Sequence, residues 1–266
     1  MLRFFRSIRQ KLLSEGKVSR YLIYALGEIL LIVIGILIAV QIGKWNDARA
    51  DERQKVLYLE RLVVNVEEDL EQLDRVMKLS SYRGSLLDDL MEAAKDPERV
   101  RERPVRFMIA VRDSGTTPNH LAWSDTYEEM ISTGYVRLLE DELYESLRRY
   151  YVRVEVSGNR QRQYDAQEDR LIELAAGILS TDQSEWLLAQ TTAVNDQDLS
   201  AIEAIGYDEA SVVEAAQRLS KKQELVDWIP RLQLNHRRNH TRLIRQSRLA
   251  NQLLAALNTE LGKKGH

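Results

Sequence analysis

Two histidines four residues apart have the spacing in this sequence that best suits metal chemistry. His236 and His240 would lie one turn apart on one helix face, as pairs of zinc-binding histidines do. The segment lacks the glutamate of an H-E-x-x-H zinc helix, and Arg237, Arg238 and Arg242 surround it with positive charge. Because both histidines continue an apolar seam of the same helix, we interpret them as packing residues and predict no metal ligands.

Other residue types that carry enzyme chemistry form no recognised catalytic pattern. Adjacent acids such as those at 67–69 and 88–89 do not share a helix face, so we interpret them as solvated charge. Tyr150 and Tyr151 are interpreted as core residues and not as a binding cage. The sequence has no cysteine, no P-loop and no G-x-S-x-G turn. We therefore expect no catalytic residue, no cofactor and no small-molecule substrate.

Among the elements that the sequence predicts, the most distinctive is a strongly apolar segment over residues 21–45. Every residue from Ile29 to Val40 is apolar or glycine, and the wider stretch can cross a hydrocarbon layer of about 30 Å. Such a span must be helical, because lipid offers its backbone no hydrogen-bonding partner. A cleaved signal peptide would be shorter and would end at small residues. Here the segment runs into Lys44 and Trp45, so we predict a retained transmembrane helix over 20–44.

Two features inside this span could have a function. Glu28 lies about two turns from the near end, and an intramembrane acid is a candidate functional group. The alternative is that Glu28 sits near the headgroups and pairs with Arg20 or a lipid. Small residues also recur on one ridge, where they would let a second helix approach closely, although glycine is common in spans generally. This ridge comprises Gly27, Gly35, Ala39 and Gly43.

The first nineteen residues are basic and have helical apolar spacing, which predicts an amphipathic helix in the lipid headgroup plane. The expected lipid-interface residues are Arg3, Phe4, Phe5, Arg6, Arg9 and Lys11, together with Trp45 beyond the span. The compact basic block predicts a cytoplasmic N-terminus. We expect a single-pass protein of a bacterial inner membrane with its C-terminal domain in the periplasm.

Residues 45–266 are predicted to form an all-helical extramembrane domain, since the chain has only four prolines and few alternating apolar runs. The first helix should end at Lys95, before Asp96 and Pro97. Further helices are expected over 125–133, from 141 to about 179, and from 208 to 228, with a break at Pro230. The last helix, about 231–261, is basic and should pack antiparallel to the acidic first one, with charge setting the register. The predicted class is all-α: one N-terminal transmembrane helix, then an antiparallel helical bundle with long coiled-coil-like first and last helices.

Three blocks carry a resemblance to a known family. They are FFRSIRQKLLSEGK (Phe4 to Lys17), YLIYALGEILLIVIGILIAVQIGKWND (Tyr21 to Asp47) and, more loosely, TYEEMISTGYVRLLEDELYESLRRYY (Thr126 to Tyr151). The chain resembles a family of uncharacterised single-pass membrane proteins common in the Bacteroidetes and related bacteria. Relatives usually have Asn-Asn where this chain has Gly43-Lys44. The resemblance implies location and architecture and carries no established activity.

The leading functional hypothesis is a non-enzymatic, membrane-anchored scaffold or partner-binding protein. Its expected partners are membrane lipid and either a second protein or another copy of itself. A net charge of −3 gives no case for nucleic acid. The alternative is a homo-oligomeric channel or pore subunit with Glu28 facing the lumen. A hydrolase that uses His236 or His240 is a third possibility.

Overall fold

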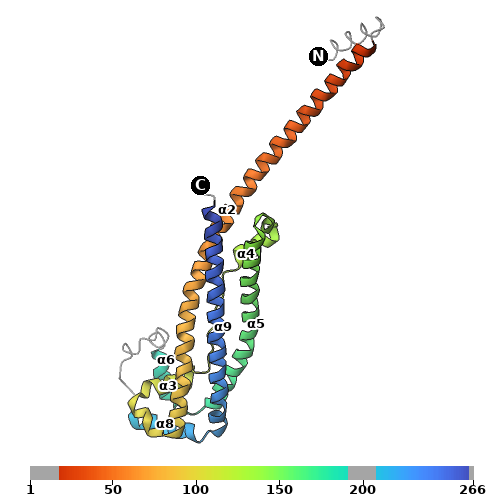
Figure 1. The fold of residues 1–266 in the computed structure, drawn as a ribbon. Coiled ribbons are helices and arrows are strands. Elements are labelled where there is room, and N and C mark those ends of the chain that lie inside the picture. The colour runs from red at the N-terminus through yellow and green to blue at the C-terminus, as the bar shows by residue number, and fades with distance from the viewer. Residues whose placement is uncertain (1–17, 191–207, 264–266) are drawn as a thin grey trace. The chain divides into compact units, whose positions relative to one another are not determined.

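The protein is helical almost throughout the residues that the computed structural model describes, 18–190 and 208–263, and none of these forms a strand. The chain divides into two compact units, Met1–Leu57 and Tyr58–His266. The predicted all-α class is confirmed, including the long first and last helices (Figure 1). The predicted interfacial helix and its residues Arg3, Phe4, Phe5, Arg6, Arg9 and Lys11 lie outside the described residues.

Helix α2, Val18–Lys95, takes in both the predicted span and the predicted first helix of the extramembrane domain. It ends where the sequence predicts. Asp96 adopts an extended conformation and its side chain accepts a hydrogen bond from the Glu98 backbone amide, which caps the following 3₁₀ helix. Pro97 occupies the first position of that helix, where a missing N–H costs nothing.

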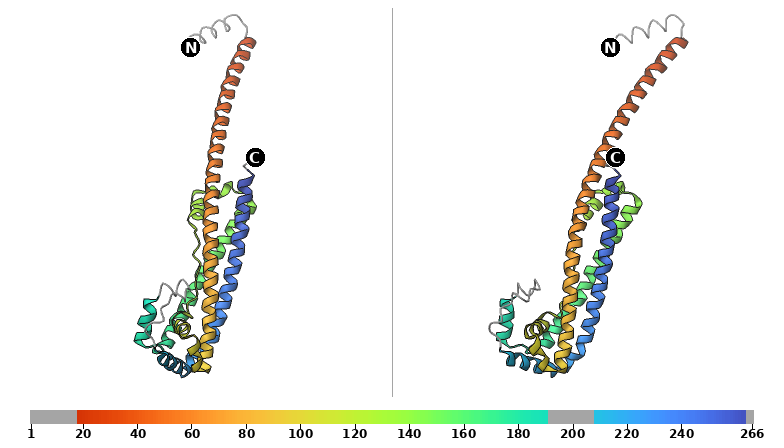
Figure 2. Two further views of the ribbon diagram at one scale, coloured as in Figure 1. Left: turned by 90° about the vertical axis from the view of Figure 1, so that its left-hand side faces the viewer. Right: turned by 60° about the vertical axis from the view of Figure 1, so that its left-hand side comes forward.

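The second unit continues through a series of shorter elements. After α2 come η1 (Pro97–Glu102) and α3 (Pro104–Asp113). Residues 114–124, here called the strap, are non-helical and connect α3 to α4. Figure 2 shows the strap running alongside the long helices. The remaining elements are α4 (Asp125–Thr133), η2 (Tyr135–Leu138), α5 (Asp141–Ala175), α6 (Thr181–Ala189), α8 (Glu209–Ser220) and α9 (Gln223–Gly262).

The predicted break at Pro230 is wrong, because Pro230 lies inside α9. The chain breaks instead at Lys221 and Lys222, between α8 and α9. A proline inside a helix removes one backbone hydrogen bond. Here Leu225, Ile229 and Leu232 are all buried on one face of the helix, so their packing outweighs the loss of that hydrogen bond.

Within the second unit, α2 and α9 lie side by side and antiparallel in all three views (Figures 1 and 2). One apolar cluster joins Leu59, Leu62, Val66 and Leu73 of α2 to α5 and to Leu243, Ala250, Leu253 and Leu257 of α9. A second cluster joins the end of α2 to α3, α6, α8 and the start of α9. Between the two, the long helices bury polar side chains at one level, which include Ser80, Ser157, Asn235, His236 and Asn239.

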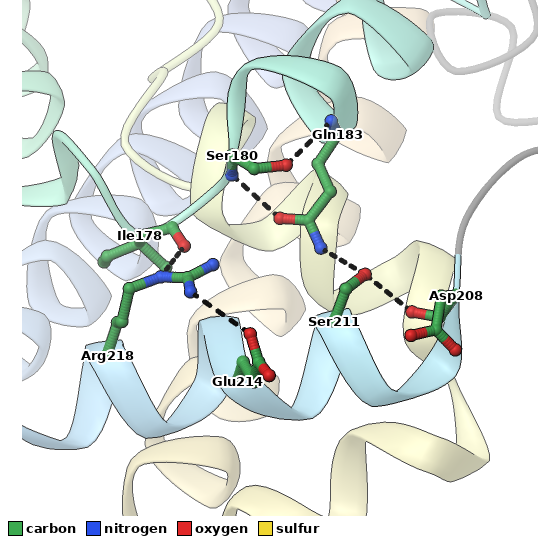
Figure 3. A network of polar contacts seen from close by, with 7 residues as sticks. All are labelled: Ile178, Ser180, Gln183, Asp208, Ser211, Glu214 and Arg218. Carbon is green, nitrogen blue, oxygen red and sulfur yellow. Dashed lines mark hydrogen bonds and ion pairs between the residues drawn. The ribbon is translucent and has the colours of Figure 1, made fainter.

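Two local devices fix the connections. Gly134 ends α4 with φ of +74°, the left-handed conformation that glycine adopts without strain, as the Thr133-Gly134 pair predicts. At the other end of the domain, Ser180 and Gln183 form a reciprocal capping box at the start of α6. Figure 3 shows the Gln183 amide donating to Ser211 of α8, while Arg218 of α8 donates to the Ile178 carbonyl. Side chains of α8 thereby hold α6 and the turn before it.

Candidate functional site

The residues predicted to act in the membrane all lie on one exposed stretch of α2. Each large apolar side chain from Leu22 to Ile42 is 45–74% exposed, and mean hydropathy reaches 2.7 over an 18-residue window. Glu28 is exposed on the same stretch. A Cβ added at Gly27, Gly35 or Gly43 would meet no atom within 4 Å, so that ridge is open, and Ala39 on it is exposed too. The structure shows that these residues are exposed on α2, and their roles toward lipid or another helix stay predictions.

Trp45 lies just beyond the apolar stretch and is 61% exposed. The guanidinium of Arg49, one turn later, lies 4.7 Å from the centre of its ring. A cation over an indole face is favourable, and such a pair suits the boundary between hydrocarbon and water.

The two histidines of α9 do not share a role. His236 is buried, and its Nε2 lies 2.9 Å from the Ser114 carbonyl oxygen, to which it donates. Burial lowers the pKa of His236, and the nearby charge of Arg83 lowers it further. His240 is half-buried, and its Nδ1 lies 3.4 Å from the hydroxyl of Ser81. His236 therefore serves the packed interior, as the sequence indicates, but through a hydrogen bond to backbone.

The interpretation of Asp69 as solvated charge is wrong. Its side chain is fully buried, and its two carboxylate oxygens accept from different elements. Oδ1 accepts from the Trp123 backbone amide at 3.0 Å, and Oδ2 accepts from the Tyr150 hydroxyl at 2.7 Å. Burial, and then the charge of Asp69, raises the pKa of Tyr150, so its hydroxyl keeps its proton.

A second partner group extends this cluster. Nε2 of His120 lies 3.3 Å from Asp69 Oδ1, an ion-pair distance without the direction of a hydrogen bond. On the other side of the ring, the amide of Gln246 donates to Nδ1 at 2.7 Å, which places the proton of a neutral ring on Nε2, facing Asp69. We call Asp69, His120, Tyr150 and Gln246 the buried network. His120 is only 3% exposed and the other three are fully buried.

The buried network belongs to a larger set of side chains that satisfy the strap. Non-helical backbone inside a bundle has no neighbour of its own to pair with, so its N–H and C=O groups need side-chain partners. Gln161 of α5 donates to the Thr117 carbonyl at 2.8 Å, and Asn239 of α9 donates to the Pro118 carbonyl at 3.0 Å. The Tyr151 hydroxyl donates to the Trp123 carbonyl at 3.2 Å. Of the polar side chains buried between the two apolar clusters, His236 and Asn239 bond the strap directly.

The arrangement has the residue types of an active site but not the access. An acid, an imidazole and a phenol converge, as in many catalytic centres. All are sealed from solvent, and each contact either links them to one another or fixes the strap. Neither the burial of Asp69 nor any role for His120 was predicted from the sequence. The available signal was that Asp69 falls in register with Leu62, Val66 and Leu73, at intervals of seven, three and four residues.

Comparison with known proteins adds one match. A model described as a family of unknown function, DUF6090, matches residues 28–199. That range runs from within the predicted span through the strap and α5 to the segment after α6. No curated protein and no solved structure matches this sequence. Because the match covers more than half of its 266 residues, the chain belongs to the DUF6090 family of unknown function.

Proposed function

We propose that the protein is a non-enzymatic, membrane-anchored helical protein that acts as a scaffold or partner-binding module. The observation that carries the proposal is the exposed apolar stretch of α2, whose 18-residue window has none of its residues buried within the chain. Burying a Leu, Ile or Val side chain is worth about 1.5–3 kcal/mol, so a stretch made of these residues favours lipid strongly over water. The apolar stretch belongs to α2, Val18–Lys95, and residues from Tyr58 onward in that helix belong to the second unit.

The proposed location is a bacterial inner membrane, with the N-terminus in the cytoplasm and the helical domain in the periplasm. The basic residues before the span support this orientation, since lysine and arginine accumulate on the cytoplasmic side.

A binding role is favoured over catalysis by what the buried network does. Its acid, imidazole and phenol are used to position the strap and are at most 3% exposed, which leaves a substrate no access to them. The exterior of the domain is therefore left to carry function.

Single cysteines test anchorage and orientation together, because the native sequence has none. Ser7→Cys and Ser184→Cys variants of the full chain would be treated in intact cells with a membrane-impermeant thiol reagent. We expect labelling at Ser184→Cys, which is on an exposed face of α6, and protection at Ser7→Cys until the cells are opened. The reverse pattern would refute the orientation, and recovery of the chain in a salt wash would refute the anchor.

The same full-length protein distinguishes the scaffold from a pore. One span per copy would require about five or more copies to enclose water. A monomer or dimer in mild detergent, measured by light scattering, agrees with the scaffold. A larger closed ring whose conductance is lost in a Glu28→Gln variant would replace it with the pore.

A further inference from the structure

A groove of about 420 Å³ lies between α5 and α9, and arginine side chains make up most of its wall. Two arginines come from α5 and four from α9, from segments that the sequence keeps more than 70 residues apart. The remaining wall is small, hydroxyl-bearing or aromatic. The lining residues are Arg153, Val156, Ser157, Arg160, Tyr164, Arg237, Arg238, Thr241, Arg242 and Arg245, and we call this surface the arginine groove.

No acidic residue lines the arginine groove among the residues that the structure describes. Its six arginines also have no acid three or four residues away along their own helices, where helical ion pairs form. Several arginines elsewhere on the domain pair with acids. Arg61 pairs with Glu129 at 2.8 Å, and Arg106 pairs with Asp89 at 2.7 Å. Among the described residues, the six guanidinium groups therefore lie together with no acidic side chain in the wall of the groove.

The basic face of α9 was expected to set its register against the acidic first helix. Arg238, Arg242 and Arg245 instead line the arginine groove with α5. Like charges that share one groove repel one another, which points to an occupant that supplies the opposite charge.

Arg242 is held in place before any ligand arrives. Its Nη1 donates to the Ser157 carbonyl at 3.0 Å, and its Nη2 donates to the Asn239 side chain. The guanidinium also lies 5.4 Å from the centre of the Tyr164 ring. Burial lowers the pKa of Arg242, yet a guanidinium stays protonated in proteins. A fixed cation at the base of a groove binds at lower entropic cost than a free one.

We propose that the arginine groove binds a small, multiply charged oxyanion of the oligophosphate class, either inorganic or carried on an organic group. Guanidinium forks match phosphate oxygens in pairs, and several phosphates are needed to balance six positive charges. The volume lies within the range of small-ligand sites. A concave site of this size fits a compact anion better than it fits the flat surface of a lipid bilayer. This inference goes beyond the scaffold role and does not depend on membrane anchorage.

The test uses full-length protein in phosphatidylcholine nanodiscs, with sodium tripolyphosphate as the probe in isothermal titration calorimetry at about 0.15 M salt. The groove variant is R238Q/R245Q, whose two side chains are exposed and have no polar contact described in the structure. The matched control is R75Q/R148Q, which removes the same charge from exposed arginines paired with Glu71 and Glu145.

We expect saturable binding to the wild type, a Kd raised about tenfold or more in the groove variant, and a change below about twofold in the control. Thermal unfolding followed by circular dichroism checks that both variants fold. Equal losses in the two variants, or no binding at about 1 mM probe, would overturn the proposal.

Two competing occupants are covered by the same assay. Hexaglutamate that binds more tightly than tripolyphosphate would assign the groove to an acidic peptide and overturn the proposal. If phosphatidylglycerol in the discs abolishes tripolyphosphate binding, the groove binds the membrane surface, and this result would also overturn the proposal. Binding that persists under both conditions supports a soluble oligophosphate.

Discussion

At the scale of single residues, Asp69 is a buried acid that joins three elements of the interior. It lies on α2, but its partners come from the strap and α5, so it ties together segments separated by up to 81 residues. An acid in such a position is costly to bury and costly to remove, since its donors would lose their acceptor inside the bundle.

We predict that Asp69→Ala lowers the free energy of unfolding by about 3–5 kcal/mol, because it leaves the Trp123 amide and the Tyr150 hydroxyl without an acceptor. Chemical denaturation of the full-length protein in detergent measures the change. Asp74→Ala is the control, since Asp74 pairs with Lys78 at the exposed surface and should cost about 1 kcal/mol or less. Similar losses for the two variants would mean that the buried network contributes little.

Periodicity could predict that α2 has a buried face but not which polar residue lies on it. On α2, apolar residues recur at intervals of three and four from Val56 through Leu59, Val63, Val66 and Leu70 to Leu73, and this spacing puts Asp69 beside the apolar seam. The fully buried residues of this stretch are instead Leu59, Leu62, Val66, Asp69 and Leu73. The two readings differ by a small rotation of one helix. What decides between them is the strap, whose course sequence spacing does not reveal.

At the scale of elements, the strap depends on side chains of other elements for the hydrogen bonds of its backbone. Helices satisfy their own backbone, so their polar faces are free to meet water. The strap takes its partners from α2, α5 and α9, and it passes so close to α5 that Gly115 has no room for a side chain. A Cβ at Gly115 would lie 2.4 Å from Leu171 Cδ2 and 3.1 Å from Leu171 Cβ.

Gly115→Ala should therefore destabilise the domain by about 1–3 kcal/mol, the usual cost of overpacking. Gly158→Ala is the opposite case, because Gly158 lies within α5 with nothing within 4 Å of an added Cβ. That variant should gain about 0.5–1 kcal/mol from helix propensity. Thermal unfolding by circular dichroism measures both, and a gain in stability for Gly115→Ala would show that the strap can move aside.

Helix ends were the most predictable elements. Asp96-Pro97, Thr133-Gly134 and Asp208 mark ends through local chemistry that acts whatever the tertiary fold, and the structure has them as predicted. Pro230 does not end a helix, because burial of Leu225, Ile229 and Leu232 outweighs the free-energy cost of the backbone hydrogen bond that proline removes. The arginine groove could not be predicted because half of it lies on α5, where the residues around Gly158 read only as a polar interval in the helix.

At the scale of the whole molecule, stability should fall in mild acid. His236 donates to the Ser114 carbonyl inside the domain, and burial lowers its pKa below the value of about 6.5 that it has in an unfolded chain. Below that pH the unfolded chain takes up a proton that the folded chain does not, so unfolding is favoured as pH falls toward the lowered pKa.

We expect the wild type to lose unfolding free energy between about pH 7 and 5, and a His236→Gln variant to lose less. Glutamine can still donate to the Ser114 carbonyl but does not titrate in this range. Chemical denaturation across the pH series measures both proteins, with His240→Gln as the matched control on the same helix. An equal change in slope for both variants would contradict the assignment to His236.

All three α9 groups that serve the strap, His236 and Asn239 directly and Gln246 through His120, leave the ribosome more than 110 residues after the strap itself. Until α9 is synthesised, the Ser114 and Pro118 carbonyl groups of the strap can accept hydrogen bonds only from water in place of His236 and Asn239. No helix then packs against the strap from the side that α9 occupies. Folding of this domain must therefore wait for synthesis of α9, so a chain halted before Gln223 should behave as an open, protease-sensitive intermediate.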